Sequence, residues 1–289
     1  MKAEEGGKAR GACLSTLAGR EREFVKVKML LDDGRPKVDP EELKEVIEKA
    51  GMTVGDRKAD IGVVVGGDGI FSMFGRNEEM PLLFVGVRSR GATGSKAYMA
   101  AAYFDELPAA LEAVAAGRFT VEEHGRLEVL KNGKHLGEVF TDVYLQRGAE
   151  SNCIRYRLKV TSKDTAIEEA AIGDGVVVTT SAGSTGYYSY PDKVDGTEMR
   201  VDAYSTVERD EIGICHITPT YTERSGTGGH PFRYTVPWDS KIELWISRNA
   251  DARLYGATAG QKGVKIGIHD RIKVIPSRNA TKVIVLKPA

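Results

Sequence analysis

The sequence has few cysteines, no excess of charge of one sign and no long hydrophobic run. Its three cysteines are far apart, without a CxxC motif or a Cys/His cluster, so neither a disulfide framework nor a zinc site is indicated. Lysine plus arginine and aspartate plus glutamate both number 41, which argues against a protein that coats nucleic acid, because such proteins carry a basic excess. No apolar run approaches the ~20 residues that a membrane-spanning helix needs. Residues 1–23 mix charges with glycine and are expected to be a flexible leader without the apolar core of a signal peptide.

These absences favour a cytoplasmic protein with neither a membrane nor a nucleic-acid partner. The five histidines are dispersed without metal spacing and are expected to be structural or exposed. Hydrophobic residues make up 41% of the chain and charged residues 28%, which is typical of globular domains.

The first part of the chain alternates strand-like and helix-like segments. They are expected in turn at residues 24–31, 39–50, 59–65, 82–87 and 104–116. Asp39 and Pro40 suit the N-cap and first position of the first helix, and Gly51 suits its end. The second strand-like run is apolar at nearly every position, as in a parallel strand covered on both faces. This rhythm predicts an α/β domain over residues 24–117.

The rest of the chain consists mainly of short alternating apolar runs. Asn132-Gly133 between two of them is a strong hairpin signal, and the chain closes with runs at 272–275 and 282–286. Residues 118–289 are therefore predicted to form a β-sandwich. Whether its last strand returns to the first domain is open.

A glycine-rich turn with one carboxylate follows the second strand-like run. The turn is Gly66-Gly67-Asp68-Gly69, and such a turn at the carboxyl end of a buried strand leaves backbone N–H groups to face phosphates. Ligands bind at that edge of open α/β sheets, where Asp68 could accept a hydroxyl proton or hold a metal. The alternative is a structural turn in which Asp68 tolerates an unusual backbone angle, and the turn taken alone slightly favours it.

A segment rich in hydroxyl groups and glycine marks a second candidate site. Asp174-Gly175 precedes a strand-like run, and residues 181–188 (SAGSTGYY) follow it. Such a loop offers O–H and N–H donors to a polar ligand, and its tyrosines could stack on a flat ring. The alternative is a polar turn with ordinary surface tyrosines.

A third candidate lies between these two. Residues 141–148 (TDVYLQRG) place Asp142 at the start of an apolar alternation, as at a strand end that faces a ligand. Taken alone, this pattern favours an exposed strand charge.

Together and in this order, the three motifs resemble those of the NAD kinase family. VVVGGDGIF, FTDVYLQRG and GDGVVVTTSAGSTGYYSY match its Gly-Gly-Asp-Gly-Thr turn, its Asn-Glu pair before a strand ending in Arg-Gly, and its Asp-Gly, strand and Thr-Pro-Thr-Gly-Ser-Thr-Ala-Tyr. The resemblance covers residues 24–289. The third motif is specific, whereas Gly-Gly-Asp-Gly also occurs in lipid kinases and phosphofructokinases.

The resemblance implies a Rossmann-like first domain, a β-sandwich second domain, and a homo-oligomer that binds NAD between the domains. ATP or polyphosphate with Mg²⁺ or another divalent metal would supply the phosphoryl group, and the metal ligands are unknown. Asp68 would orient or deprotonate the 2′-hydroxyl of the adenosine ribose, and Gly66, Gly67 and Gly69 would hold the donor phosphates. The implied acceptor residues are Thr141, Asp142, Asp174, Ser184, Thr185, Gly186 and Tyr187.

A basic loop follows the third strand-like run. Arg88, Arg90 and Lys96 lie there, at the sheet edge where ligands bind. Because a planar guanidinium suits bidentate phosphate contacts, we interpret Arg88 and Arg90 as candidate phosphate ligands. The alternative is a solvated basic loop.

The chain departs from the family pattern at several positions. Ile70 replaces the threonine after the turn, Thr141-Asp142 replaces Asn-Glu, and Ala259 replaces an aspartate. Two other hypotheses therefore stay open: a kinase of the same fold that phosphorylates a sugar, nucleoside or lipid, and a catalytically weak nucleotide-binding protein.

Overall fold

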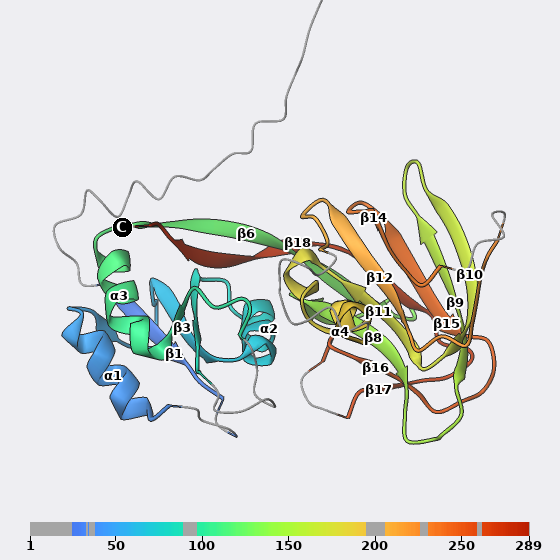
Figure 1. Ribbon diagram of the computed structural model, residues 1–289, viewed down its shortest axis with the longest axis horizontal. Helices are drawn as coiled ribbons and strands as arrows, with labels where there is room; N and C mark the ends of the chain where they lie inside the picture. The colour runs from blue at the N-terminus through green and yellow to red at the C-terminus, as the bar shows by residue number, and fades with distance from the viewer. Residues whose placement is uncertain are drawn as a thin grey trace, which may run out of the picture.

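The computed structural model describes residues 25–32, 34, 38–88, 97–194, 206–225, 231–258 and 262–288. It consists of an α/β domain and a β-sandwich domain, and the long strands β6 (Phe119–Lys131) and β18 (Ile272–Leu286) run from one to the other (Figure 1). The fold class expected from the sequence is therefore confirmed. No helix in these ranges is long and apolar enough to cross a membrane.

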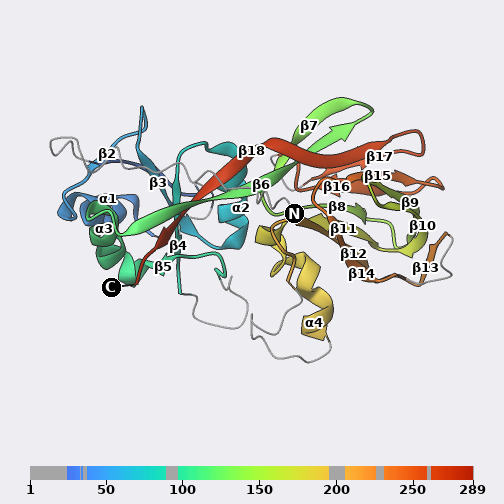
Figure 2. The same ribbon diagram turned by 90° about the horizontal axis from the view of Figure 1, so that it is seen from above.

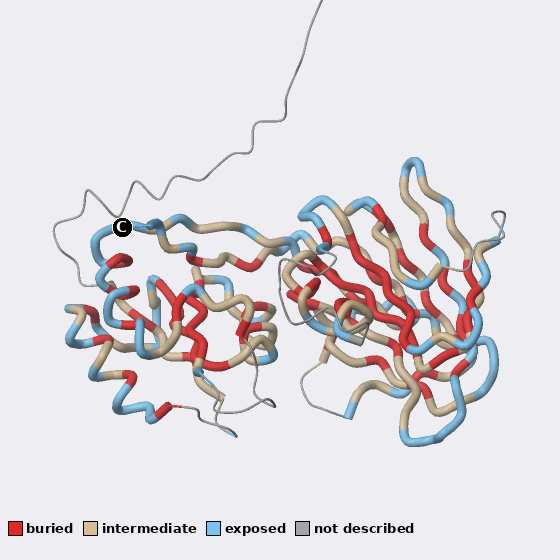
Figure 3. The backbone as a smooth tube through the Cα atoms, in the orientation of Figure 1, coloured by how far each residue is buried: buried red, intermediate tan, exposed pale blue. Residues whose placement is uncertain are grey.

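Parallel strands flanked by helices build the α/β domain. Its elements are β1 (Lys26–Leu30), α1 (Pro40–Lys49), β2 (Thr53–Val54), β3 (Ile61–Gly66), α2 (Asp68–Asn77), β4 (Leu82–Gly86), β5 (Ala102–Tyr103), η1 (Phe104–Glu106) and α3 (Leu107–Ala115). The strands lie in the order β5-β4-β3-β1-β2 and all pair in parallel. Every residue of β3 and β4 is buried, shown in red in Figure 3, because both faces of these strands are covered.

Local signals set the bounds of α1. The Asp39 carboxylate accepts a hydrogen bond from the backbone N–H of Glu41 at 3.0 Å, and Pro40 occupies the first turn. Gly51, with φ of +76°, follows the helix in the left-handed conformation that ends many helices. These are the cap and stop that the sequence indicated.

The β-sandwich domain contains the remaining elements. They are β7 (Lys134–Val139), β8 (Asp142–Arg147), β9 (Ile154–Thr161), β10 (Ala166–Gly173), β11 (Gly175–Thr179), η2 (Ser181–Gly183), η3 (Tyr187–Ser189), α4 (Tyr190–Val194), β12 (Glu211–Ile217), β13 (Tyr221–Arg224), β14 (Arg233–Pro237), β15 (Lys241–Ile246), β16 (Ala252–Tyr255) and β17 (Val264–Ile266). One sheet has the order β14-β12-β11-β8-β16-β17, and it packs on β13-β10-β9-β15-β18. Alternating burial along β9 and β15 is that of strands with one face in a core.

The strands β6 and β18 tie the two domains into one continuous sheet. They pair antiparallel along their length, with an irregularity between Pro276 and Ala280. The start of β18 pairs with β15 of the sandwich, and its end pairs in parallel with β4, Val283 opposite Leu82. The last strand thus returns to the α/β domain, as the view from above shows (Figure 2).

Candidate active site

Asp68 lies where β3 ends and α2 begins. Gly67 is the N-cap of α2 and Asp68 is its first residue, so the helix begins within the segment that the sequence suggested was a turn. A carboxylate in the first turn is stabilised by the positive end of the helix dipole. Asp68 also accepts a hydrogen bond from the backbone N–H of Met99 at 3.1 Å, which joins it to the segment after β4.

The glycines around Asp68 differ in what surrounds them. A Cβ atom on Gly66 would lie 2.9 Å from Cβ of Ile70, so a glycine is needed for the first turn of α2 to pack on β3. A Cβ atom on Gly69 would meet nothing within 4 Å. The space beside Gly69 is therefore open to a ligand, as a donor-phosphate site requires.

Arg88 lies at the edge of this region and contacts two acidic residues. Its guanidinium lies 3.3 Å from Oδ2 of Asp105 and 2.8 Å from Oε1 of Glu106, and it stacks 4.2 Å from the ring centroid of Tyr103. The guanidinium of Arg88, which the sequence suggested as a phosphate ligand, therefore contacts the acidic residues of η1 in this structure. Arg90 and Lys96, the other basic residues of the loop, and Ala259 lie outside the described residues.

Thr141 connects α2 with the start of β8. Its hydroxyl group lies 2.6 Å from that of Ser72 on α2 and donates to Asp142 at 2.9 Å. The carbonyl oxygen of Thr141 accepts hydrogen bonds from the backbone N–H of Thr180 at 2.8 Å and from the hydroxyl of Thr179 at 3.2 Å. Two of the predicted acceptor residues therefore lie next to the helix that carries Asp68.

The carboxyl group of Asp142 lies in a largely desolvated position. Burial raises the pKa of Asp142, and the hydrogen bond from the Thr141 hydroxyl opposes that increase. Asp142 pairs with Thr179 of β11 across the sheet. Perturbed carboxyl groups of this kind are common where ligands bind.

A cluster of tyrosine rings lies beside Asp142. Tyr144 is stacked on Tyr255 with 5.2 Å between ring centroids and meets the edge of Tyr187 at 5.4 Å. Tyr187 meets Tyr190 at 6.0 Å. Tyr187 was predicted from its motif, whereas Tyr144 and Tyr255 were not, although Tyr144 follows Asp142 by two residues and so shares its side of the strand.

Tyr188 is the neighbour of Tyr187 but has a different environment. Only 2% of its surface is exposed, and burial raises its pKa to about 12. Its ring packs in a small core with Val177, Val207 and Cys215. Of the two adjacent tyrosines, therefore, Tyr187 alone is placed to stack on a ligand.

Asp174 lies at the turn between β10 and β11. Its carboxylate forms an ion pair with Arg147, with 2.6 Å between Nε and Oδ1. Gly175 follows with φ of +149°, and a Cβ atom there would lie 2.0 Å from the carbonyl oxygen of Leu145. The Asp-Gly pair is therefore fixed by close backbone contact with β8.

The segment after β11 folds back on itself. The hydroxyl of Ser184 donates to the carbonyl oxygen of Ser181 at 2.8 Å, so Ser184 points into the turn, where it is 5% exposed. The carbonyl oxygens of Thr185 and Gly186 accept hydrogen bonds from the hydroxyl of Ser189, each at 2.9 Å. This part of the predicted acceptor site is a compact turn with a largely internal set of bonds.

Lys193 on α4 contacts the backbone of this segment. Its ammonium group donates to the carbonyl oxygens of Thr185 at 3.0 Å and Gly186 at 3.2 Å. Burial lowers the pKa of Lys193, and the negative charges of Asp68 and Asp192 oppose that decrease. Asp68 therefore lies within electrostatic reach of the acceptor segment, and Lys193 is a residue that the sequence did not single out.

The arrangement brings a carboxylate, hydroxyl-rich backbone turns, aromatic rings and an ammonium group together from both domains. Figures 1 and 2 show α2 on the side of the α/β domain that is nearer the sandwich. A carboxylate held at a helix start can accept the proton of a hydroxyl group that attacks a phosphorus atom. The tyrosines offer flat surfaces for stacking.

No family model matches the chain. The NAD kinase of Geobacter sp. strain M21 is 27% identical over 237 residues, which cover 78% of this chain and 72% of that protein. Yeast NADH kinase complexed with NADH shares the fold, with a TM-score of 0.65, 15% identity and coverage of 92% of this chain and 84% of that one. The NAD kinase from Archaeoglobus fulgidus in complex with ATP gives a TM-score of 0.61 at 19% identity and covers 89% of this chain and 92% of that one.

The solved structures show a common fold, and the sequence relative spans most of both chains. The resemblance found from the three motifs is thereby confirmed: the chain is similar in sequence to NAD kinases over 78% of its length, and it shares the fold of solved NAD and NADH kinases.

Proposed function

We propose that the protein is an NAD kinase, which transfers the γ-phosphoryl group of ATP to the 2′-hydroxyl of the adenosine ribose of NAD. Asp68 carries this proposal, because it begins α2 at the end of β3 and lies within electrostatic reach of Lys193 on the acceptor side. The relatives named NAD kinase, and the NADH and ATP complexes of proteins with this fold, support the choice of substrates.

In the proposed reaction, the bond between the γ-phosphorus of ATP and its bridging oxygen breaks, and ADP leaves. A bond forms between that phosphorus and the 2′-oxygen of the ribose, and the hydroxyl proton passes to the carboxylate of Asp68 and then to solvent. Phosphoryl transfer depends mainly on positioning and on neutralising charge. One well-placed carboxylate is therefore sufficient as the base.

Magnesium or another divalent cation is the expected cofactor, with ATP or polyphosphate as donor. Within the described ranges, no group of three or more His, Cys, Asp or Glu is placed to hold a metal ion. Mg²⁺ usually binds through one or two carboxylates together with substrate phosphates, so the donor phosphates would supply part of its ligands, and Asp68 keeps its role as the base. Bound there, the cation would neutralise charge on the donor.

The first test is to incubate the protein with ATP, Mg²⁺ and NAD and to measure NADP with an NADP-specific dehydrogenase. We expect NADP to form, and Asp68→Asn to lower kcat by about 10²–10⁴-fold, which is the usual contribution of a general base. Asp164→Asn, at the exposed turn between β9 and β10, is the matched control and should keep full activity. Turnover by Asp68→Asn at the parent rate contradicts the role given to Asp68.

The same assay separates the competing acceptors. If NAD is inert while a sugar, nucleoside or lipid consumes ATP, the acceptor in our proposal is wrong. If no acceptor is phosphorylated but nucleotides raise the melting temperature, the protein binds nucleotides without acting as a kinase.

We also expect a cytoplasmic homo-oligomer that assembles through the β-sandwich. Three partly exposed apolar side chains, Tyr221, Phe232 and Ile268, lie in that domain and support this expectation. Sedimentation velocity at micromolar concentration tests it, and a monomer at every concentration contradicts it.

A further inference from the structure

Lys193 occupies a position between the two halves of the proposed site. Its ammonium group is held by the carbonyl oxygens of Thr185 and Gly186, at 3.0 and 3.2 Å. Burial lowers the pKa of this group, and the negative charge of Asp68, at the start of α2 on the other domain, opposes that decrease. A ligand hydroxyl group bound at the Thr185–Gly186 turn would therefore lie near this ammonium group.

An ion pair fixes the helix that carries Lys193. Asp192, its neighbour on α4, forms two bonds of 2.7 Å each with the guanidinium of Arg233 on β14. Both side chains are largely buried, with 14% and 16% of their surface exposed. Such bidentate contacts fix the relative orientation of the two side chains. The ion pair therefore holds α4, and with it the backbone of Lys193, against β14.

The chemistry at this position needs a cation. A carboxylate base and the oxygens of a transferring phosphoryl group are all negative, and they repel one another unless positive charge lies close by. Arg88 contacts Asp105 and Glu106, whereas Lys193 is directed to the acceptor turn.

We infer that Lys193 binds the phosphoryl group as it reaches the 2′-oxygen, and that it then recognises the 2′-phosphate of the product. The inference rests on the proposed function and adds a residue that acts on substrate. As the bond from the γ-phosphorus to the 2′-oxygen forms and the bond to ADP breaks, the ammonium group donates hydrogen bonds to the phosphoryl oxygens, and its own protons stay in place. Lys193 therefore favours the transition state and NADP over NAD.

The experiment compares Lys193→Met, Lys193→Arg and the parent in two assays. In steady-state kinetics, we expect Lys193→Met to lower kcat about 10²–10³-fold, as the loss of one preorganised donor does, with KM for NAD changed by less than about threefold. In calorimetric binding without ATP or metal, the preference for NADP over NAD should fall roughly 10- to 100-fold, the value of one charge-assisted hydrogen bond. Lys193→Arg keeps the cation and should retain most of that preference.

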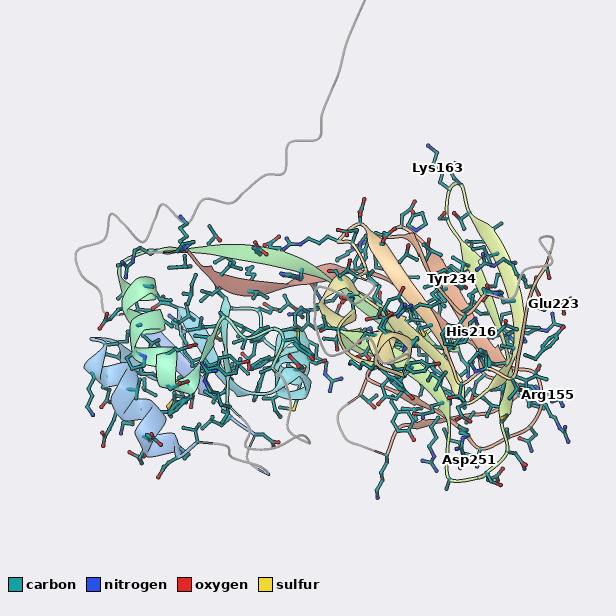
Figure 4. The ribbon with its side chains drawn as sticks, in the orientation of Figure 1. Arg155, Lys163, His216, Glu223, Tyr234 and Asp251 are labelled. Atoms are coloured by element: carbon teal, nitrogen blue, oxygen red, sulfur yellow. The ribbon has the colours of Figure 1, made fainter. Side chains whose placement is uncertain are left out.

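Lys163→Met is the matched control, because Lys163 lies at the exposed tip between β9 and β10, away from α4 (Figure 4). It should leave both assays unchanged. Equal losses of NAD and NADP affinity in Lys193→Met, together with a lower melting temperature, show that Lys193 only anchors α4 and overturn the inference. Unchanged kcat and unchanged NADP preference overturn it as well.

The binding assay keeps this inference separate from the proposed function. If the parent makes no NADP from NAD, the proposed function fails, and the binding comparison then decides on Lys193 alone. A preference for the 2′-phosphate that disappears in Lys193→Met supports phosphate recognition, and its absence in the parent refutes it.

Discussion

Two opposing interactions act on the carboxyl group of Asp142. Burial raises its pKa, and the bond from Thr141 only partly opposes this. For an acid whose folded pKa lies above its unfolded value of ~3.9, the native state binds more protons than the unfolded state between the two values. Stability therefore falls as pH rises through that interval, and the charged carboxylate destabilises the ligand-free protein at neutral pH.

Asp142→Asn should accordingly raise the melting temperature at pH 7 while leaving it close to the parent value near pH 3. The gain should be a few degrees, because about 1 kcal/mol shifts the melting temperature of a domain of this size by ~2–4 °C. Thermal unfolding from pH 3 to pH 8 measures this, with Asp164→Asn as control. A lower melting temperature at pH 7 means that the Asp142 carboxylate is stabilising there and that burial is not its dominant interaction.

At the scale of residues, the sequence predicts the site residues that lie within short motifs. It does not predict those that strand pairing or contact between the domains brings to the site. Asp68 and Tyr187 belong to short motifs and were readily proposed. Tyr255 meets Tyr144 only because β16 and β8 pair in a particular register, which no local pattern reveals. Lys193 is separated from Asp68 by more than a hundred positions, so its importance depends on how the two domains meet.

Among the secondary-structure elements, five strands of the sandwich share one buried polar network. Glu169 of β10 lies 3.2 Å from Nε2 of His216 on β12 and accepts hydrogen bonds from Tyr234 on β14 at 2.8 Å and Arg224 on β13 at 2.9 Å. Nδ1 of His216 lies 2.7 Å from the hydroxyl of Tyr156 on β9. Figure 4 shows His216 and Tyr234 within the sandwich. The network joins the two sheets.

Glu169→Gln should destabilise the protein by about 3 kcal/mol, because removing one charge leaves its buried partners uncompensated. Burial alone would raise the pKa of Glu169, but hydrogen bonds from His216, Tyr234 and Arg224 hold it below its ordinary value. The ionised Glu169 therefore stabilises the folded protein. This contribution is fully present above the unfolded pKa of ~4.3 and is lost as pH falls through the folded pKa. Urea unfolding from pH 2.5 to pH 7 should therefore show the parent and variant converging at low pH.

Glu168→Gln is the control on the same strand. Its ion pair with Arg157 is exposed, with 44% of the Glu168 side chain and 49% of Arg157 accessible, so it should change stability by less than about 0.5 kcal/mol. A constant difference between Glu169→Gln and the parent at every pH runs against the assigned ionisation.

The elements themselves were predictable where local signals coincide. The cap, first proline and terminal glycine of α1 all act within a few residues and gave its position closely. The strands at the end of the chain were harder to predict from the sequence. Pro276 separates two apolar runs that were expected to be distinct strands, but both pair with β6 and form the single strand β18. Because both runs pair with the long strand β6, they form one strand, although the sequence between them suggested an interruption.

On the scale of the whole molecule, α2 joins the two domains through side-chain contacts, in addition to the pairing of β6 and β18. The Ser72–Thr141 bond fixes it to β8, and Thr281 of β18 donates to the carbonyl oxygen of Gly75 at 2.6 Å. A polar pocket of about 400 Å³ lies next to this junction and includes Arg126 and Glu138 in its lining. The placement of Asp68 therefore depends on contacts at the far end of its own helix.

Arg126 of β6 is central to that junction. It is 3% exposed, and its guanidinium donates to the carbonyl oxygens of Arg76 at 2.9 Å and Glu78 at 2.7 Å and to the hydroxyl of Thr281 at 2.9 Å. It also lies 3.4 Å from Glu138 of β7. One side chain thus binds the end of α2 to both long strands, and a planar fork of donors is required for that geometry.

Arg126→Met should lower the free energy of unfolding by about 3–5 kcal/mol, because Glu138 and two carbonyl groups lose a buried partner. Arg126→Lys should restore little, since a single ammonium group cannot reach three elements at once. Because α2 also carries Asp68, kcat should fall even at temperatures where the variant stays folded. Denaturant titration with parallel kinetics at 15 °C measures both effects, and Arg157→Met on the exposed face of β9 should change neither. A loss in Arg126→Met below about 1 kcal/mol, with kcat intact, means that the Ser72–Thr141 and Thr281–Gly75 bonds hold the helix in place without Arg126.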